Sequence, residues 1–503
     1  MADYLGSEVA VQTGQRAIVK GAFWTYLGQG VVVLATLLSN VILARLLDKE
    51  NWGIFSLVIS VVSFLSAFSD AGFNYTIQNR LASSADKKPS HMRSVLGALL
   101  RYKLILIAVS TLVFFLAAWG GYLSDLFKIS GSQYFIAGAA FFLFFNLSGA
   151  LDSVFIGLRQ FKNFSFTSSV FQIIRLVLSV LLVVAGFGVM GAINGYVLAL
   201  MVAISTQVYL LRDYLSWRGK STEPLAEQFK YGFSVGIASM AYVIYFYSGA
   251  VVIGLLVNPT AVGFYRIATG IAASTIGAVI VINKVMFSFF SSEKDSESSM
   301  IHLKRALKYA AIFALPACIG LAASSDVIVG TFFGNQYLPS FAALMVLGYF
   351  VFDAVYGGIL ISYLAAKGQS AILGKVAAVA IPLNLILGLL FVNLFGFVGA
   401  AMASVLVGVS ALIYLFLLAE KKLNMSFDLS VFKQPFISSF IMLLVLVVIK
   451  PYLINPDYLL SVFNVLGLGV YVAVGALAYF VSAYLLGFEL HVFIQKLYRL
   501  LRS

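Results

Sequence analysis

Charge is scarce in this sequence. Asp, Glu, Lys and Arg together make up 11% of its 503 residues, whereas hydrophobic residues make up 61%. Soluble globular chains carry about 25% charged residues, so this composition excludes an ordinary soluble fold. It indicates an all-α polytopic membrane protein.

Cysteine and histidine are nearly absent. Cys318 has no second cysteine with which to form an intrachain disulfide, and His91, His302 and His491 lie far apart in the sequence. A metal site needs several such ligands close together, so no metal or other cofactor is expected. The GKS at 219–221 lacks the first glycine of a phosphate-binding loop, because Tyr214 occupies its place. Nucleotide-driven pumping is therefore not expected.

Long apolar runs are what the sequence has in abundance. Residues 21–43 carry no charge, and as a helix they are long enough to cross a hydrocarbon core of about 30 Å. Further runs bring the prediction to fourteen membrane-spanning helices; they lie at 52–73, 95–117, 133–157, 168–187, 191–211, 231–256, 262–290, 304–323, 337–366, 371–391, 396–419, 434–453 and 459–486.

Polar residues on the first two of these helices fall into stripes at the α-helical repeat of about 100° per residue. The stripes are Thr25, Gln29, Thr36 and Asn40 on the first helix, and Ser56, Ser60, Ser63, Asp70 and Asn74 on the second. Polar atoms that face lipid are costly, so each stripe is expected to face protein or water. Two helices with inward polar faces predict a transporter-like cavity.

Lys and Arg are distributed unevenly between alternate loops. With the N-terminus placed in the cytoplasm, all but six of the 33 Lys and Arg residues fall on the inside; the exceptions are Arg45, Lys49, Lys128 and Lys450 in outside turns and Arg175 and Arg266 within helices. The positive-inside rule therefore predicts that both termini are cytoplasmic. This placement accounts for the net charge of +13 without a nucleic-acid partner.

The predicted outside connections are short, as at 187–191, 257–261 and 391–396. They leave no room for a domain that could hold a catalytic centre, so the sequence does not indicate an enzyme.

The two halves of the chain repeat weakly. LLDKENWGIFS (46–56) aligns with LVNPTAVGFYR (256–266), which places Gly53 over Gly263. GLRQF (157–161) aligns with AAKGQ (365–369), and GVMGAI (188–193) with GFVGAA (396–401). Three matches in order predict two parallel six-helix lobes. The predicted organisation is a cytoplasmic segment 1–20, an N-lobe 21–213, a linker 214–230, a C-lobe 231–420, two further helices within 421–488 and an amphipathic cytoplasmic tail 489–503.

Several of these segments are similar to a known family. ARLLDKENWGIFS (44–56), SDAGFNYTIQNR (69–80) and VGFYRIA (262–268) resemble the polysaccharide transporter (Wzx-type) branch of the MOP flippase superfamily, over about residues 16–425. The resemblance implies two MATE-like lobes around a central cavity that work by alternating access. The implied substrate is an oligosaccharide linked to undecaprenyl pyrophosphate, turned to the periplasmic leaflet of a bacterial inner membrane for O-antigen, capsule or exopolysaccharide synthesis. Membrane lipids, a polysaccharide polymerase and a chain-length regulator are the implied partners.

Three basic residues could lie on the path of an anionic head group. Arg175 shares a helix face with Ser168, Gln172 and Ser179, and a guanidinium there would suit a pyrophosphate or an acidic sugar. The alternative is that it snorkels to the head groups. Arg266 and Lys284 project from one face of the eighth helix, five turns apart. They could pass a head group along the helix or anchor it at the two interfaces.

Three acids lie within predicted spans: Asp353, Asp70 and Asp152. Asp353 is the deepest and is expected to serve as an ion-pair partner or proton carrier. For Asp70 and Asp152, helix packing or capping is an equal alternative. Pro316 and Pro382 interrupt the ninth and eleventh helices, either as bends that open and close the cavity or as static kinks.

Three other functions compete with the lipid-linked oligosaccharide flippase. A MATE-like drug or cation antiporter would favour an acid in the first helix, but residues 21–43 have none. A peptidoglycan-precursor (lipid II) flippase would favour a basic cluster midway along that helix, which is also missing. A membrane glycosyltransferase would need a sizeable outside loop.

Overall fold

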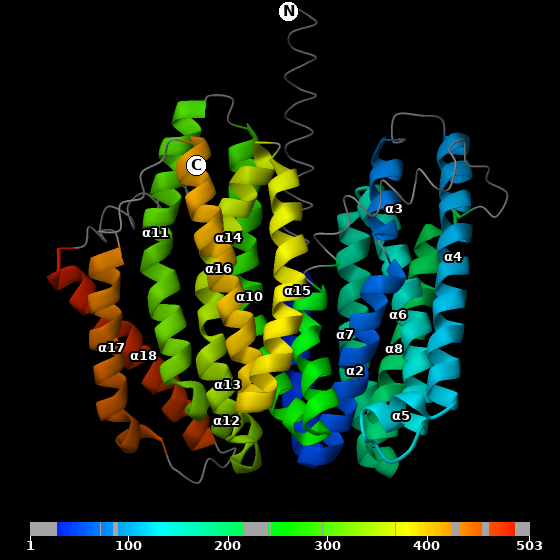
Figure 1. Ribbon diagram of the computed structural model, residues 1–503, viewed down its shortest axis with the longest axis horizontal. Coiled ribbons are helices and arrows are strands. Elements are labelled where there is room, and N and C mark those ends of the chain that lie inside the picture. Colours follow the sequence, from blue (N-terminus) through cyan, green and yellow to red (C-terminus); the bar gives the residue numbers. More distant parts are fainter. Residues whose placement is uncertain are drawn as a thin grey trace, which may run out of the picture. The chain divides into compact units, whose positions relative to one another are not determined.

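The computed structural model describes residues 28–70, 72–83, 89–215, 240, 243–292, 296–367, 369–423, 432–454 and 462–487. Their regular secondary structure is helical throughout, and the chain forms two compact units, Met1–Gly263 and Phe264–Ser503. Within each unit the helices run alongside one another (Figure 1). Thr25 and the side chain of Lys284 lie outside the described part.

The first unit begins with the helix Gly28–Leu46. It continues with α2 (Lys49–Asp70), α3 (Phe73–Ser83), α4 (Pro89–Trp119), α5 (Tyr122–Leu126), α6 (Gln133–Gly157), α7 (Phe161–Leu182), the π-helical turn η1 (Val183–Phe187), α8 (Gly188–Leu211), the helix Val243–Leu256 and the start of α10 (Pro259–Ser292).

The second unit contains the rest of α10 and the helices that follow it. These are α11 (Ser296–Ala323), α12 (Ser325–Phe333), the 3-10 turn η2 (Asn335–Tyr337), α13 (Ser340–Leu347), α14 (Tyr349–Ala366), α15 (Ser370–Phe395), α16 (Phe397–Leu423), α17 (Lys433–Leu453) and α18 (Val462–Leu485).

Within the described ranges, eleven helical stretches are long and apolar enough to cross a membrane. One of them, Phe161–Leu211, holds both α7 and α8. The shorter helix Val243–Leu256 and α10 cover two more of the predicted segments. Every predicted apolar run therefore contains helix, and fourteen crossings stays a prediction. So do the lobe limits, because the two units divide at Gly263 and not at the predicted linker.

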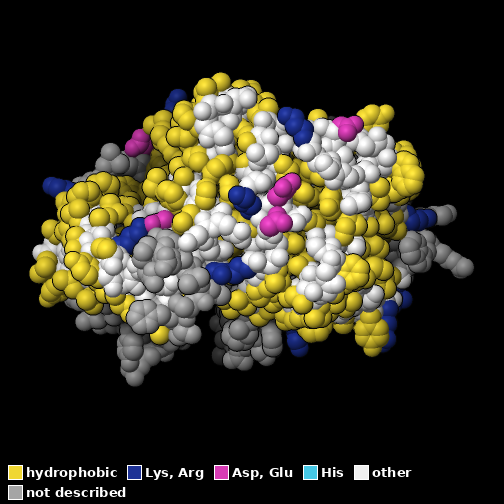
Figure 2. All heavy atoms as spheres, turned by 90° about the horizontal axis from the view of Figure 1, so that it is seen from below, with side chains coloured by type: hydrophobic (Ala, Val, Ile, Leu, Met, Phe, Trp, Pro, Cys, Tyr) yellow, Lys and Arg dark blue, Asp and Glu magenta, His cyan; other side chains and the backbone are white. Residues whose placement is uncertain are grey.

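Helix α4 shows what surrounds these helices. Ile105, Val109, Leu112, Val113 and Leu116 lie on one face of it, and each is 56–63% exposed. A water-soluble protein would bury such a stripe, whereas lipid tails solvate it. Figure 2 looks onto the lower ends of the helices in Figure 1, where Lys, Arg, Asp and Glu side chains lie among hydrophobic ones. The chain is a multi-pass membrane protein.

The sequence prediction missed short helices at the ends of the long ones. Residues 52–73 were expected as one span, but α2 ends at Asp70 and α3 begins at Phe73. Gly72 between them has φ 78°, a left-handed conformation that ends an α-helix. The helices α5 and α12 form in stretches that were expected to be turns.

The role of Pro316 and Pro382, as bends or as static kinks, stays a prediction. Both lie inside helices, α11 and α15, which continue past them. A membrane helix tolerates proline where neighbouring groups satisfy the freed carbonyl.

The two glycines that the sequence repeat aligned meet in a close contact. The indole Nε1 of Trp52 donates a hydrogen bond to the Gly263 carbonyl oxygen at 3.2 Å. A Cβ on Gly53 would overlap the backbone of Pro259, and a Cβ on Gly263 would lie 3.2 Å from the Gly53 Cα. Only glycine allows the start of α2 and the start of α10 to approach this closely.

This contact predicts that Gly53→Ala destabilises the protein by about 1–3 kcal/mol, because backbone atoms cannot make room for the added methyl group. Gly30→Ala is the matched control, since nothing lies within 4 Å of a Cβ at that position. Unfolding in detergent measures both variants. An equal effect of the two would contradict the close packing at Gly53.

Candidate functional site

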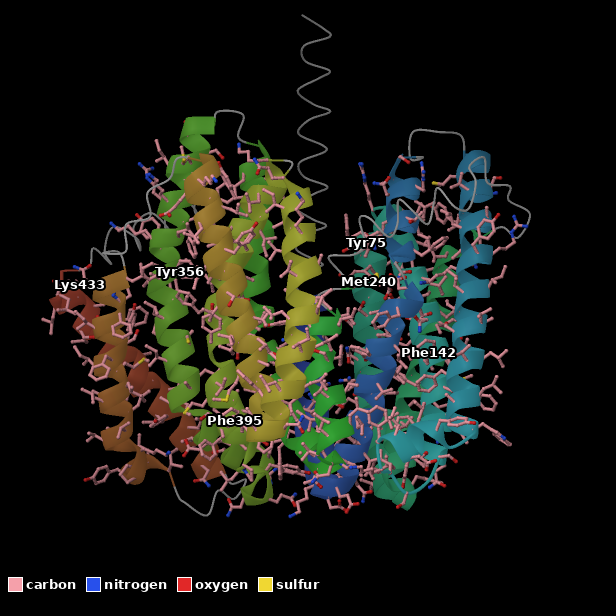
Figure 3. The ribbon with its side chains drawn as sticks, viewed as in Figure 1. Tyr75, Phe142, Met240, Tyr356, Phe395 and Lys433 are labelled. Atoms are coloured by element: carbon pink, nitrogen blue, oxygen red, sulfur yellow. The ribbon has the colours of Figure 1, made fainter. Side chains whose placement is uncertain are left out.

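A pocket of about 510 Å³ lies among α2, α3, α6 and the helix Val243–Leu256. Its wall contains aromatic side chains together with side chains that bear hydroxyl, amide or carboxylate groups. Its lining includes Ser63, Ser66, Asp70, Asn74, Phe145, Asn146, Ser148, Asp152, Phe171, Met240, Phe246 and Tyr247. Met240 is labelled in Figure 3. We call this the large pocket.

A second pocket of about 280 Å³ adjoins it, among the helix Gly28–Leu46, α6, α7 and α8. The two share Ser148, Asp152 and Phe171, so one wall separates them. The other polar residues of this small pocket are Gln29, Ser165, Thr167, Ser168, Gln172 and Gln207.

Asp152 lies on α6, on that shared wall. The Gln207 Nε2 of α8 donates hydrogen bonds to the Asp152 Oδ1 at 2.8 Å and to the Ser148 Oγ at 3.2 Å. Gln207 is 1% exposed, and its Oε1 has no hydrogen-bond partner among the described residues. A neutral amide therefore orients the carboxylate without neutralising it.

Asp70 forms an ion pair with the Lys103 ammonium of α4. Lys103 is 1% exposed and the Asp70 side chain 20%, so the lysine is enclosed while the acid reaches the large pocket. The Asn74 N–H also donates to the Asp70 Oδ1, at 3.2 Å. The break at Gly72 makes this possible, because the acid at the end of α2 can cap the first turn of α3.

Asn146 is another buried polar group of the large pocket, 6% exposed. Its Nδ2 donates to the Ser66 Oγ at 3.0 Å and to the Phe142 carbonyl oxygen at 2.8 Å. The second bond is within α6 and the first reaches α2, so Asn146 holds the two helices together beside the pocket.

Arg175 is buried at the contact of α7 with α8. Its Nη1 donates to the Tyr196 hydroxyl at 2.8 Å, and its guanidinium carbon lies 4.7 Å from the centre of that ring. At 6% exposure it does not snorkel, and it lines neither pocket. The residues that were predicted to share its helix face do not stay together. Ser168 and Gln172 line the small pocket, whereas Ser179 packs on Gly195, and a Cβ added to Gly195 would overlap Ser179.

Other predicted lining residues do not reach the pockets. Ser56 and Ser60 are 2% and 0% exposed, and the Ser60 hydroxyl donates to the Ser56 carbonyl oxygen of its own helix at 2.7 Å. Thr36 and Asn40 are half-buried on Gly28–Leu46, away from both pocket walls. Ser63, Asp70, Asp152, Gln29 and Gln172 do come together there.

The second unit contains Arg266 and Asp353, both half-buried. Among the described residues Asp353 makes no hydrogen bond or ion pair, and its Oδ1 lies 3.2 Å from the position of a Cβ on Gly357. Tyr356, one turn further along α14 and labelled in Figure 3, donates its hydroxyl to the Leu307 carbonyl oxygen at 3.0 Å. The role of Asp353 stays a prediction.

The comparisons with known proteins agree with the sequence resemblance. A family model described as polysaccharide biosynthesis protein matches residues 18–294, more than half of the chain. The chain belongs to the polysaccharide biosynthesis protein family.

Relatives of this polysaccharide biosynthesis protein include transporters by name. It is 22% identical over 404 residues to a putative O-antigen transporter of Shigella flexneri, which covers 77% of this chain and 94% of the relative. It is 27% identical over 168 residues to a probable low-salt glycan biosynthesis flippase of Haloferax volcanii; that match covers 32% of this chain and 35% of the relative.

Among solved structures, the lipid II flippase MurJ in an inward closed conformation is similar to this polysaccharide biosynthesis protein. The TM-score is 0.71 at 16% sequence identity, over 94% of this chain and 99% of that chain. At this identity the likeness shows the fold alone. It confirms the predicted fold class.

Sequence reasoning missed two residues of the site in this polysaccharide biosynthesis protein. Lys103 was counted among the cytoplasmic basic residues, although the predicted span 95–117 contains it, and its burial in α4 was not foreseen. Gln207 was not singled out, although it is one of only two amides, with Asn194, within the apolar run 191–211, a signal that could have found it.

The ion pair of Asp70 with Lys103 predicts a strongly non-additive double-mutant cycle. Lys103→Met alone is expected to destabilise the protein by about 3 kcal/mol, because it leaves an acid without its cation. Adding Asp70→Asn is expected to restore most of that loss. Unfolding of the single and double variants in detergent measures the coupling. If the effects of the two substitutions are additive, the ion pair contributes no coupling energy to the stability of the protein.

Proposed function

We propose that this family member is a flippase that turns an oligosaccharide linked to undecaprenyl pyrophosphate from the cytoplasmic to the outer leaflet of a bacterial cytoplasmic membrane. It works by alternating access and makes no covalent change to its cargo. The product serves the synthesis of a surface polysaccharide. Both termini lie in the cytoplasm, on the side where Lys and Arg are concentrated.

The composition of the two pockets is the observation that carries this proposal. Phe145, Phe171, Phe246 and Tyr247 present aromatic surface next to Asp152 and the amides of Asn74 and Gln207. A sugar has an apolar C–H face that packs on aromatic rings and hydroxyl groups that donate to carboxylate and amide oxygens. A purely hydrophobic drug would leave these buried polar groups without partners, at a cost.

The family and the names of the relatives support the same proposal. The family is described by polysaccharide biosynthesis, and the Shigella flexneri relative, aligned over most of both chains, is named as an O-antigen transporter. A polysaccharide polymerase and a chain-length regulator are proposed as partners that consume the product on the outer side.

A reconstituted transport assay tests the proposal. The full chain is placed in vesicles with an undecaprenyl-pyrophosphate-linked disaccharide, and an impermeant pyrophosphatase is added outside. We expect the inner pool of lipid to become cleavable in vesicles with the protein and to stay protected in protein-free vesicles. Protection in both would overturn the proposal, and efflux of a cationic dye instead would favour an antiporter.

Phe171 predicts a specific transport defect, because it lines both pockets. Phe171→Ala is expected to slow translocation of the same lipid about two- to tenfold, since an aromatic contact contributes about 0.5–1.5 kcal/mol. Phe166→Ala is the matched control, because Phe166 lies on the same helix but is 55% exposed. Equal translocation rates for Phe171→Ala and Phe166→Ala would show that Phe171 does not contact the substrate during transport.

A further inference from the structure

The charged side chains on the described walls of the two pockets are all acidic. Among the described residues, their walls contain two carboxylates, Asp70 and Asp152, and no Lys or Arg. Lys103 neutralises Asp70. Asp152 is bonded to the neutral amide of Gln207, while Arg175 on the neighbouring helix donates to Tyr196 and not to either acid. One carboxylate on the shared wall therefore has no counter-charge within the part of the chain that the structure describes.

Hydrogen-bond acceptors are also in excess on these walls. On the pocket walls, three amide oxygens are buried without a hydrogen-bond partner among the described residues: Asn74 Oδ1, Gln172 Oε1 and Gln207 Oε1. All three residues line a pocket, and Gln207 is the most enclosed of them, with 1% exposure. Buried acceptors of this kind call for a ligand that brings hydrogen-bond donors.

We infer that the pockets select a glycan residue that brings hydroxyl or amine donors and carries no acidic group. The inference rests on the proposed function and names its substrate class. A carboxylate on the sugar would meet an acid and no Lys or Arg on the described walls, so it would be buried without a counter-charge, which is costly. It would also add acceptors where acceptors are already in excess. A neutral or amino sugar satisfies both conditions.

The test compares two undecaprenyl-pyrophosphate-linked disaccharides whose terminal residue is either glucose or glucuronic acid. Each lipid is reconstituted with the full chain. An impermeant pyrophosphatase cleaves the same pyrophosphate bond in both lipids and so measures the translocation of each. We expect the glucose lipid to move at least about tenfold faster, which corresponds to about 1.4 kcal/mol.

Two substitutions in the pocket should move this ratio in opposite directions. Asp152→Asn removes the acid from the shared wall and should lower the ratio. Asn74→Asp adds a third acid to the large pocket, beside Asp70 and Asp152, and should increase the ratio. Asp125→Asn, the same chemical change at an exposed position outside both pockets, should keep the wild-type ratio.

The outcomes separate the inference from the function on which it rests. Equal translocation of the two lipids by the wild-type protein would overturn the charge selection and leave the flippase standing. A ratio that neither Asp152→Asn nor Asn74→Asp changes would likewise overturn it. If neither lipid moves, the proposed function fails and the inference fails with it.

Discussion

A charged or hydrogen-bonding group inside an apolar helix bundle must find its partners within the protein, and the first unit is arranged around that constraint. Asp70 takes Lys103 as its counter-charge, and both stay within the bundle. Asp152 receives a neutral amide from Gln207. Burial of the lysine in α4 and of the glutamine in α8 thus draws these helices towards α2 and α6. On the pocket walls, the oxygens of Asn74, Gln172 and Gln207 remain without a hydrogen-bond partner among the described residues.

The constraint also explains why Arg175 is not a pocket residue. A guanidinium in the middle of the membrane is costly unless it is paired, and the Tyr196 hydroxyl and ring partly meet this need within the bundle. The Tyr196 ring in turn packs edge-on to Phe55 and Phe141, at 5.4 and 5.7 Å between ring centres. The arginine is therefore part of the packing of α2, α6, α7 and α8.

Much of the fold could be predicted from the sequence, because a membrane helix is specified by one long apolar run. The run 133–157, for instance, coincides with α6. The break between α2 and α3 could not be predicted, since the residues on both sides of Gly72 continue the same apolar and polar pattern. The periodicity of a helix shows which residues share a face. It does not show which helix that face meets.

The same limit applies to the site. The stripes correctly brought Ser63, Asp70, Gln29 and Gln172 to pocket walls, but they also included Ser56 and Ser60, which face packed helix. The pairing of Asp152 with Gln207 joins residues 55 positions apart, and nothing in a single sequence states that α6 and α8 are neighbours. The burial of Lys103 depends on the acid on α2, and a single sequence does not show that these two residues meet.

The most direct test of the account asks whether the sugar occupies the shared wall of the pockets. With Cys318 replaced by Ser, the protein has no other cysteine, and Ser148→Cys places a single thiol on that wall. Its labelling by a water-soluble thiol reagent is measured in vesicles, with Ser130→Cys in the exposed turn between α5 and α6 as control. The account predicts that a lipid-linked disaccharide protects the thiol introduced at position 148, while undecaprenyl pyrophosphate without sugar does not. Equal labelling of that thiol in the presence and absence of the disaccharide would contradict it.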